Sequence, residues 1–296
     1  MSAAESGRGL GQAELPGLKL FRRGKVRDTF DLGERLLMVS TDRLSAFDSV
    51  LPSLIPDRGR VLTAMSRHWF ADTADLVPNH LLDDDPETIP HPARPQLQGR
   101  CMWVRRAERI DVECVVRGRL AGSGWAEYAD RGTLAEEPLS PGLAFGAELS
   151  PARFTPASKN DAGHDQNISR RELAERVGSQ LATELEERSL AIFERAREGC
   201  RRAGFTLVDT KFEFGFVEGR LTLIDELLTP DSSRLWEAAE GGPGGAAGFD
   251  KQLVREHLLA SGWDRNPPAP PLPPELVAET RRRYLEACRR ITGHDL

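Results

Sequence analysis

Ionisable and apolar side chains alternate along residues 205–216, and a second apolar run follows at 220–228. Asp209, Lys211 and Glu213 occupy odd positions of the first run. The even positions are apolar, namely Val208, Phe212, Phe214 and Phe216. Because successive side chains of a strand point to opposite faces, this pattern predicts a strand with three ionisable groups on one face and aromatic rings packed behind.

The chemistry of this segment depends on how the predicted hairpin turns. A three-residue turn, Glu218 to Arg220, places Glu213 directly across from Asp225, so that both carboxylates share the face of Lys211. A two-residue turn would put the carboxylates on opposite faces, because the side-chain period of a strand is two. Two carboxylates beside a lysine suit a Mg²⁺–polyphosphate site, since magnesium takes one or two carboxylates together with phosphate oxygens and water. The alternative is a solvated strand face that carries an ion pair.

A second group of cations lies near the start of the chain. Gly24, Lys25 and Arg27 fall between two short predicted strands. A glycine there lets the backbone approach a ligand, and the two cations could neutralise phosphates. A plain β-turn is the simpler interpretation, because the chain contains no GxxxxGK[ST] phosphate loop.

Two arginine segments have a similar composition. Arg117 precedes Ser123 at the predicted start of a helix, and Arg234 follows the hairpin. Guanidinium forks and helix N-termini both bind phosphate. In a chain this rich in arginine, chance spacing is an equal alternative, and residues 231–234 also suit a helix cap.

The segment 158–165 is unusually polar. It packs six polar side chains into eight positions, among them Lys159, His164 and Asp165. A single histidine is more often structural than catalytic, but so dense a polar loop is typical of a functional segment.

Lysine is scarce, because only five of the 40 Lys and Arg residues are lysines. Genomic base composition explains such a bias without reference to function. A lysine nevertheless offers a compact ammonium that meets phosphate as a point charge, whereas arginine is a rigid fork. All five are candidates for phosphate contact, namely Lys19, Lys25, Lys159, Lys211 and Lys251.

The elements that must position these groups mix short strands with helices. The predicted strands lie at 19–22, 25–30, 35–40, 102–106 and 112–120, and the predicted helices at 61–76, 122–131, 179–203, 250–260 and 274–292. Residues 136–167 are predicted to form a polar loop, and Ser169 with Glu172 a capping box that opens a helix. Early hairpins, mixed helix and antiparallel strand, and the lack of a βαβ series indicate an α+β fold.

Bulk composition excludes several classes of protein. A net charge of −6 gives no general attraction to nucleic acid or to an anionic membrane. The four cysteines form no CxxC pair and the six histidines show no HExxH spacing, so a zinc site is disfavoured. Neither an apolar leader nor an apolar run of about 18 residues occurs, which favours a cytoplasmic protein.

Eight segments, in this order along nearly the whole chain, together resemble the SAICAR synthetase (phosphoribosylaminoimidazole-succinocarboxamide synthase) family. They are GKVRDTF at 24–30, STDRLSAFDSVLP at 40–52, GRVLTAMSRHWF at 59–70, VECVVRGRLAGSGW at 112–125, SKNDAGHDQNIS at 158–169, DTKFEFGF at 209–216, DELLTPDSSRLW at 225–236 and FDKQLVREHL at 249–258. One such segment alone would not identify the family, but eight segments in the same order are specific to it.

The resemblance implies an ATP-dependent ligase of de novo purine biosynthesis. Such an enzyme joins the carboxylate of carboxyaminoimidazole ribonucleotide (CAIR) to the amine of L-aspartate through an acyl phosphate, giving SAICAR, ADP and phosphate, with Mg²⁺. It also implies an α+β fold, distantly similar to kinases and ATP-grasp enzymes, in which ATP lies between two lobes. We expect a β-rich nucleotide-binding lobe at 1–107 and a larger substrate- and metal-binding lobe at 108–296. Whether the chain is a monomer or a homodimer stays open.

Roles for individual residues follow from the resemblance. ATP would meet Gly24, Lys25 and Arg27 and the backbone near Met102 and Val104. The Mg²⁺ ligands would be Glu213 and Asp225. The substrate contacts would be Arg117, Ser123, Asp165, Arg234 and Lys251. Catalytic contacts near the transferred phosphate and the substrate would come from Lys159, Asp209 and Lys211.

Two departures and two rival functions accompany this hypothesis. Gln166 and Asn167 depart from the usual residues after the His-Asp pair, and the glycine-rich stretch 241–248 is atypical. One rival is a kinase-like phosphotransferase with another acceptor, and the other is a non-catalytic nucleotide-binding regulator. The general base for the amine is not identified by the sequence, although Asp209 and His164 are candidates.

Overall fold

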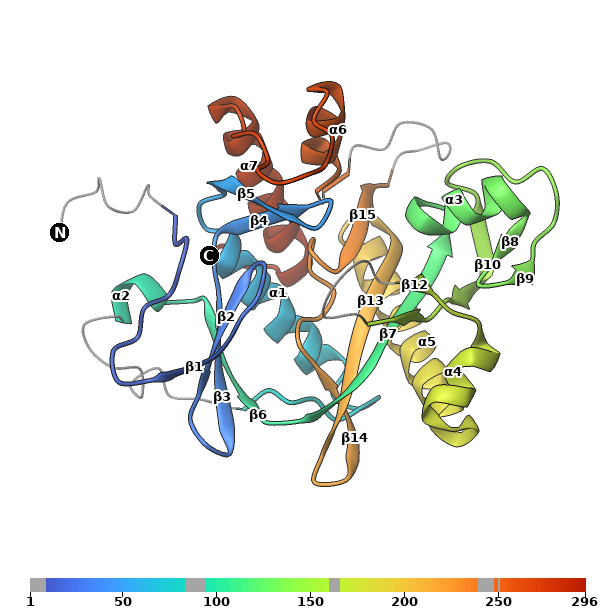
Figure 1. Cartoon of the computed structure of the whole chain (residues 1–296), viewed down its shortest axis with the longest axis horizontal. Coiled ribbons are helices and arrows are strands. Elements are labelled where there is room, and N and C mark those ends of the chain that lie inside the picture. Colours follow the sequence, from blue (N-terminus) through green and yellow to red (C-terminus); the bar gives the residue numbers. More distant parts are fainter. Residues whose placement is uncertain (1–8, 83–93, 160–165, 239–247, 250) are drawn as a thin grey trace.

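The computed structural model describes residues 9–82, 94–159, 166–238, 248–249 and 251–296. Two antiparallel sheets stand side by side, and helices pack behind and above them (Figure 1). This mixture of helices with antiparallel sheets confirms the α+β prediction.

The first sheet has the strand order β1–β2–β3–β6, and each neighbouring pair is antiparallel. Its strands are β1 (Lys19–Arg23), β2 (Arg27–Asp31), β3 (Arg35–Ser40) and β6 (Cys101–Arg105). Alternation along β3 divides the faces, because Leu37 and Val39 pack with Phe30 and Trp103, whereas Met38 joins the main core on the other side. The β1–β2 turn of this sheet contains Gly24 and Lys25, and Arg27 begins β2.

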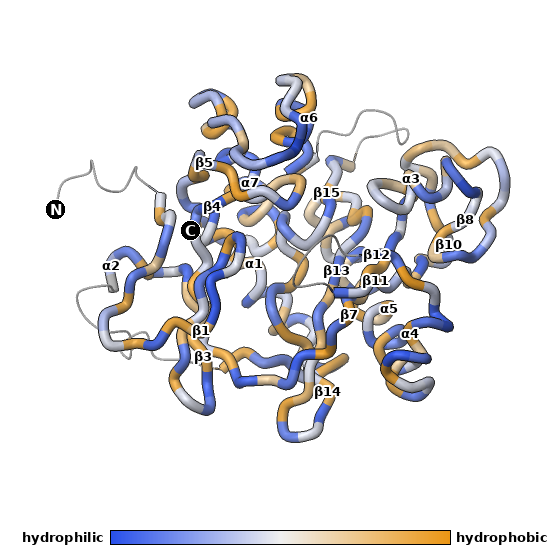
Figure 2. Tube along the Cα trace, in the orientation of Figure 1, coloured by the Kyte–Doolittle hydropathy of each residue, from blue (hydrophilic) through white to orange (hydrophobic). Residues whose placement is uncertain are grey.

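The larger sheet has the strand order β12–β11–β7–β13–β14, with β10 also paired to β7 and β15 to β13. Its strands are β7 (Glu108–Arg119), β10 (Glu148–Phe154), β11 (Ala157–Ser158), β12 (Gln166–Asn167), β13 (Phe205–Val217), β14 (Arg220–Ile224) and β15 (Ser233–Glu237). Hydrophobic stretches recur along β7, β13 and β14 at the centre of the molecule (Figure 2). These stretches form the main core together with the helix that covers them.

That helix is α5 (Ser179–Arg202), which lies behind β7 and β13 beside α4 (Arg170–Val177) (Figure 1). Its buried residues recur every three or four positions, as in Leu185, Ser189, Ile192 and Ala196, so a single apolar stripe faces the sheet. Ser169 caps α4 by accepting a hydrogen bond from the Glu172 amide, which confirms that half of the predicted capping box.

The C-terminal helices return to the N-terminal half of the chain. Helix α7 (Pro274–Thr292) packs on α1 (Arg58–Asp72), and α6 (Gln252–Ala260) packs on the hairpin of β4 (Arg43–Ala46) and β5 (Ser49–Leu54). The remaining elements are α2 (Arg94–Leu97), α3 (Gly122–Arg131), β8 (Thr133–Leu134) and β9 (Glu137–Pro138). The proposed lobe boundary at 107/108 falls between β6 and β7, but α6 and α7 contact elements on both sides of it.

The predicted three-residue hairpin turn is wrong. Val217 pairs with Arg220, so the turn has two residues, Glu218 and Gly219, and Glu213 pairs with Ile224 rather than Asp225. Both turn residues have positive φ, as the tight turns that match strand twist require. The residues alone left both turn lengths open, and the family resemblance favoured the longer turn because that register puts Glu213 and Asp225 on one face.

The even-position alternation along β13 is also broken. The register against β15 shifts by one residue between Leu207 and Asp209, which marks a β-bulge at Val208. Val208 therefore packs with Ala121 and Trp236, away from the core that contains Phe212 and Phe214.

Two further predictions need correction. The stretch 136–167 contains strands β9 to β12 as well as loop. Strand β9 pairs with β8, β10 and β11 pair with β7, and β12 pairs with β11, and local sequence does not reveal these partners. The first helix spans Arg58–Asp72 rather than 61–76. The hairpin of β4 and β5 was missed, since its strands are short.

Close packing at the start of α1 provides a test of the fold. A Cβ on Gly59 would lie 2.2 Å from the Ser40 carbonyl oxygen and 2.7 Å from Arg100 Nη1. We therefore expect Gly59→Ala to lower the free energy of unfolding by about 1–3 kcal/mol, the cost of overpacking a rigid site, as measured by urea denaturation. Gly11→Ala is the control, because its Cβ would meet only Leu54 at ordinary distance, 3.4 Å. Equal midpoints for the two variants would contradict the packing.

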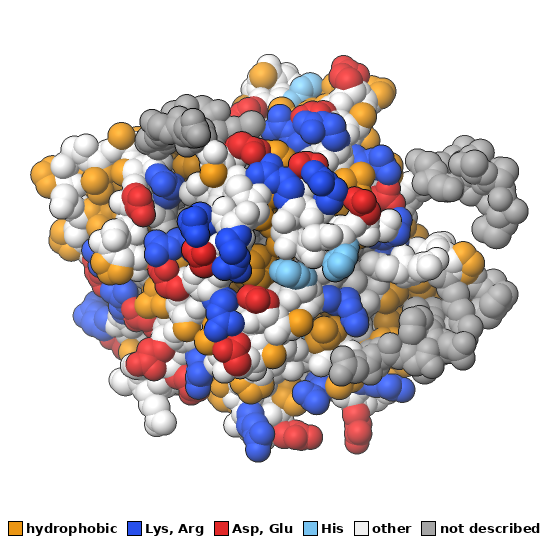
Figure 3. Space-filling model, turned by 180° about the vertical axis from the view of Figure 1, so that it is seen from behind, with side chains coloured by type: hydrophobic (Ala, Val, Ile, Leu, Met, Phe, Trp, Pro, Cys, Tyr) orange, Lys and Arg blue, Asp and Glu red, His pale blue; other side chains and the backbone are white. Residues whose placement is uncertain are grey.

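The surface carries charges of both signs. On the face seen from behind, Lys and Arg side chains intermingle with Asp and Glu (Figure 3). Within the described part of the chain, no helix is both long and apolar enough to span a bilayer.

Candidate active site

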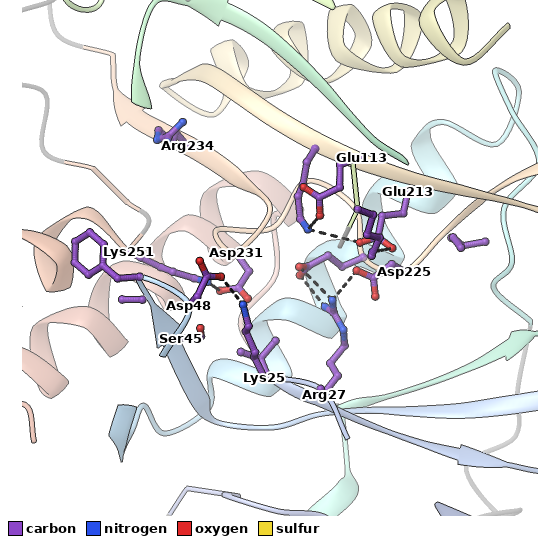
Figure 4. Close-up of a pocket in the computed structure, with 18 of the residues that line it drawn as sticks. Lys25, Arg27, Ser45, Asp48, Glu113, Glu213, Asp225, Asp231, Arg234 and Lys251 are labelled. Atoms are coloured by element: carbon purple, nitrogen blue, oxygen red, sulfur yellow. Dashed lines mark hydrogen bonds and ion pairs between the residues drawn. The ribbon is translucent and has the colours of Figure 1, made fainter. Parts of the chain in front are cut away.

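A cavity of about 1720 Å³ opens between the two sheets. The first sheet contributes the β1–β2 turn and the end of β6, and the hairpin of β4 and β5 closes one side. The larger sheet contributes β7, β13 and the segment after β14, and α6 lines the remaining side. Figure 4 shows charged side chains of the β1–β2 turn, the β4–β5 turn, β7, β13 and the segment after β14 gathered around this cavity.

Asp225 reaches this cavity although it does not pair with Glu213 across the hairpin. Strand β14 ends at Ile224, and Asp225 takes a positive φ of 69°, which turns the chain out of the ladder. Asp tolerates that conformation better than most residues. The two carboxylates then lie next to each other (Figure 4), and the charge of Glu213 helps to raise the pKa of Asp225. The turn at Asp225 thus brings the two carboxylates together, as the predicted three-residue hairpin turn would have done.

The guanidinium of Arg27 is shared by two carboxylates. Arg27 Nη2 lies 2.7 Å from Asp225 Oδ2, and Arg27 Nη1 lies 2.9 Å from Glu226 Oε2. Burial raises the pKa of Asp225 above its usual range. The charge of Arg27 acts against this rise, whereas repulsion from Glu213 and Glu226 adds to it. This end of the cavity holds an excess of negative charge among the described residues, which favours a cation.

Lysines compensate Glu213 instead. Lys159 forms an ion pair with Glu213 Oε2, and Lys211 lies 3.6 Å from Oε1. Burial opposes the charge of Glu213, but Lys211 and Lys159 outweigh it and lower its pKa to about 2. Glu213 is therefore ionised at neutral pH.

Glu113 was not singled out by the sequence, yet it completes this cluster. It lies on β7 directly across from Glu213, and its Oε1 is 2.5 Å from the Lys211 ammonium. Although burial acts against it, the charges of Glu213 and Glu113 raise the pKa of Lys211 above its usual range. Pairing of β7 with β13, which the sequence could not specify, brings the three groups together.

Arg117, Asp209 and Arg234 form a second group of charges. Arg117 Nη1 donates to Asp209 Oδ2 over 3.0 Å, and Arg234 pairs with the same oxygen. Arg117 Nη2 also donates to Ser123 Oγ over 2.9 Å. Arg234 lines the cavity, as does Lys251, another residue assigned to the substrate. Arg117, Ser123 and Asp209 are not among the described lining residues. Two guanidiniums on one carboxylate leave a positive charge available for an anion.

Gly122 explains why Arg234 can lie where it does. A Cβ on Gly122 would stand 2.2 Å from Arg234 Nη2, and the φ of Gly122 is +56°. Only glycine satisfies both conditions without moving the guanidinium. Gly122, at the start of α3, thus makes room for the arginine.

Lys251 and Asp231 form a third group. Lys251 Nζ lies 2.8 Å from Asp231 Oδ1, and both residues line the cavity. Burial lowers the pKa of Lys251, and the attraction of Asp231 offsets that effect only in part.

The β1–β2 turn stands at the mouth of the cavity. Lys25 pairs with Asp48 of the β4–β5 turn, and both side chains are about half exposed. The Gly24 amide donates to the Arg27 carbonyl over 2.8 Å, so this segment is a tight turn as well as a cavity wall. The plain-turn and ligand-facing interpretations are therefore compatible.

The two β6 residues assigned to the nucleotide lie in different surroundings. Val104 lines the cavity, but Met102 is buried in the core and pairs with Met38. The backbone of β6 is hydrogen-bonded on both edges, to β3 and to residues 80–82, so the amides in its middle already have partners. Residues 105–107 follow along the cavity wall and are further candidates, although the Arg105 and Arg106 amides already donate to the carbonyls of His80 and Glu34.

His80 is a further polar group that the sequence did not single out. It lines the cavity, and burial lowers its pKa to about 3, so the imidazole is neutral. Its Nε2 has no hydrogen-bond partner among the described residues. His164 and Asp165 lie outside the described residues. The described residues contain no group of three or more His, Cys, Asp or Glu that could hold a metal by itself.

Known proteins resemble this chain over almost its full length. A family model described as SAICAR synthetase matches residues 20–270. A phosphoribosylaminoimidazole-succinocarboxamide synthase from Syntrophobacter fumaroxidans is 46% identical over 290 residues, covering 96% of each chain. One from Leptospira interrogans is 49% identical over 265 residues, covering 88% of this chain and 93% of that protein.

Solved structures agree with these relatives. A structure described as SAICAR-synthase from Saccharomyces cerevisiae complexed with SAICAR has a TM-score of 0.89 and 35% identity, and covers 97% of this chain and 99% of that chain. Another, described as a SAICAR synthetase in complex with ADP, has a TM-score of 0.68 at 23% identity, covering 93% and 98%. The second likeness supports the fold alone.

Proposed function

This chain belongs to the SAICAR synthetase family, and from that premise we propose how its cavity carries out the reaction of the family. The chain is an ATP-dependent ligase of purine biosynthesis that joins CAIR and L-aspartate to give SAICAR, ADP and phosphate. The observation that carries our assignment of roles is the separation of charge in one cavity. A negative excess lies at Arg27, Asp225 and Glu226. Positive excesses lie where Arg234 shares Asp209 with Arg117, and where Lys251 shares Asp231 with a second arginine.

ATP and Mg²⁺ belong at the negative end in this proposal. The triphosphate would meet Lys25 and Arg27, and adenine would contact the backbone of residues 105–107. Glu213 and Asp225 would hold Mg²⁺, because the cation prefers carboxylate oxygens. Phosphate oxygens and water would complete its coordination shell, so a third protein ligand is not required. When bound, the ion would neutralise charge on the phosphate oxygens.

CAIR belongs at the positive end. Its phosphate and carboxylate suit Arg234 and Lys251, which face the cavity. Arg117 and Asp209 act behind Arg234 by fixing its guanidinium, with Ser123 held by Arg117. Asp209 therefore acts in our proposal as a positioning residue rather than as the base for the amine, because its carboxylate already accepts from two arginines.

The chemistry proceeds in two transfers. A carboxylate oxygen of CAIR attacks the γ-phosphorus of ATP, the bond to ADP breaks, and an acyl phosphate forms. The aspartate amine then attacks the acyl carbon, phosphate leaves with the bonding electron pair, and the nitrogen loses a proton. Lys159 and Lys211 lie beside Glu213 and would neutralise charge on the phosphoryl group as it moves. Most of the rate enhancement would come from positioning and from these charges.

The function is tested by mixing the protein with ATP, Mg²⁺, CAIR and L-aspartate and following ADP and SAICAR together. We expect equal amounts of both products, and no ADP without aspartate beyond a single turnover. Continuous ADP release without aspartate would favour the kinase-like rival, and intact ATP binding without turnover would favour the regulatory one.

An acyl phosphate route needs no cysteine nucleophile. Burial raises the pKa of Cys101, Cys114 and Cys200 to about 12 and also raises the pKa of Cys288, so none offers a thiolate at neutral pH. We expect native protein treated with N-ethylmaleimide at pH 7 to keep its ligase activity, while urea-unfolded protein takes up the reagent at all four positions, as counted by mass spectrometry. Stoichiometric inactivation through one cysteine, prevented by CAIR, would argue for a thioester instead.

Localisation and oligomeric state belong to the proposal as well. We propose a cytoplasmic enzyme with small-molecule substrates, acting as a monomer or homodimer. Light scattering of the purified protein distinguishes the two states.

A further inference from the structure

Arg58 is a charged side chain without exposure to solvent. It begins α1, and its guanidinium reaches three other parts of the chain. Nη1 donates to the Arg43 carbonyl over 2.6 Å, Nη2 pairs with Asp231, and the group stands 5.8 Å from the ring centroid of Tyr284 on α7. Burying an arginine is costly unless it is well paired, so this position calls for an explanation.

The pairing places two cations on one oxygen. Asp231 Oδ1 accepts from Arg58 Nη2 and also lies 2.8 Å from Lys251 Nζ. Lys251 and Asp231 line the cavity, whereas Arg58 is not among its described lining residues. The arrangement repeats that of Asp209, whose single oxygen holds Arg117 behind and Arg234 in the cavity.

The charge balance around Lys251 depends on Arg58. Without it, Asp231 and Lys251 would form a closed neutral pair. The other carboxylate that acts on both cations is Glu226, but Glu226 is committed to Arg27 and accepts from Thr229 Oγ1 over 2.6 Å. With Arg58 present, a positive charge is left over at the cavity wall.

We infer that Arg58 is a positioning residue that engages Asp231 from behind and so keeps Lys251 available to an anionic group of the substrate. This inference rests on the proposed role of Lys251 in holding CAIR. The competing explanation is that Arg58 only ties α1 to β4, α7 and the loop after β14. That role would affect stability and not the recognition of one substrate.

The test compares Arg58→Gln, which keeps a hydrogen-bond donor but removes the charge, with Arg58→Lys, which keeps the charge. We expect Arg58→Gln to raise the KM for CAIR about 10- to 100-fold, the usual worth of a hydrogen bond to a charged group, with the KM for ATP nearly unchanged. Arg58→Lys should keep the KM for CAIR within about threefold of the wild type, on the same scale. The KM for L-aspartate, measured in parallel, shows whether the anion belongs to CAIR or to the amino acid.

A second background isolates the path through Lys251. In Lys251→Met protein, adding Arg58→Gln should not raise the KM for CAIR further, because the residue through which Arg58 acts is gone. The pH profile gives an independent readout. Arg58 helps to lower the pKa of Lys251, so the alkaline limb of kcat/KM for CAIR should move to higher pH in Arg58→Gln.

Several results would overturn the inference. One is a lower melting temperature for Arg58→Gln with an unchanged KM for CAIR, and another is an equal rise in KM in the Lys251→Met background. Should Arg58→Gln fail to fold, Arg58→Lys decides, because a folded Arg58→Lys variant with a tenfold higher KM for CAIR excludes the charge-based role.

Two results separate this inference from the proposals on which it rests. If Lys251→Met leaves the KM for CAIR unchanged in an active enzyme, the proposed role of Lys251 is wrong. If the wild-type protein shows no ligase activity, the proposed function is wrong.

Discussion

Asp225→Asn is expected to lower kcat for the ligation by about 10²–10³-fold, the cost of losing one preorganised electrostatic group at a transferring phosphate. The fold should persist, because Arg27 keeps Glu226 as a partner and asparagine tolerates the positive φ of 69° at this position. The variant should also need a higher Mg²⁺ concentration for half-maximal rate, since Glu213 would be the one proposed carboxylate ligand left. Initial rates across a Mg²⁺ titration, together with a melting curve, measure both effects.

The control for this prediction is Glu218→Gln. Glu218 is an exposed carboxylate on the same hairpin, five residues beyond Glu213 and away from the cavity lining that the described residues form. Its replacement should leave kcat and the Mg²⁺ dependence unchanged. Wild-type turnover by Asp225→Asn at limiting Mg²⁺ would remove Asp225 from the metal site, whatever the behaviour of the control.

Asp209→Asn is expected to have the largest effect on stability. Asp209 is buried at 4% exposure, and its carboxylate is the shared partner of Arg117 and Arg234. Removing its charge leaves the buried guanidinium of Arg117 uncompensated, which typically costs about 3–5 kcal/mol of unfolding free energy. Urea denaturation followed by circular dichroism measures the loss, and the KM for CAIR should rise because Arg234 loses its anchor.

Two comparisons make this prediction specific. Asp130→Asn alters an exposed aspartate whose partner, Arg131, is also exposed, so its urea midpoint should match the wild type. Arg234→Met should be less destabilising than Asp209→Asn, because Asp209 then keeps Arg117 as its partner. A wild-type midpoint for Asp209→Asn would mean that the buried carboxylate does not hold the two arginines together.

The charged groups around Asp209 and Asp231 have the same arrangement. In each, a buried carboxylate holds one arginine behind the cavity wall and presents a second cation to the cavity, namely Arg234 or Lys251. A cation anchored in this way loses little rotamer freedom when a ligand binds, which lowers the entropic cost of recognition. Four of the five lysines, all but Lys19, line this cavity, although the protein as a whole carries a net charge of −6.

Local sequence determined the elements and much of the cavity. Period-two alternation marked β13, the spacing of apolar residues marked α5, and Ser169 marked the start of α4, because each signal depends only on neighbours along the chain. Of the residues assigned to ATP, Mg²⁺ or catalysis, Lys25, Arg27, Lys159, Lys211, Glu213 and Asp225 do line one cavity. Their individual roles remain predictions.

Only the tertiary structure decided how the charges are paired. Arg27 meets Asp225 across 198 residues of chain, and Arg58 meets Asp231 across 173. The bulge at Val208 and the two-residue turn after Val217 set which side chains face the cavity, and both arise from strand pairing. Glu113 and Arg58 carry no local signal that distinguishes them from solvated charges. Their importance comes from burial and from a shared partner, and these exist only when distant segments are brought together in the low-dielectric interior.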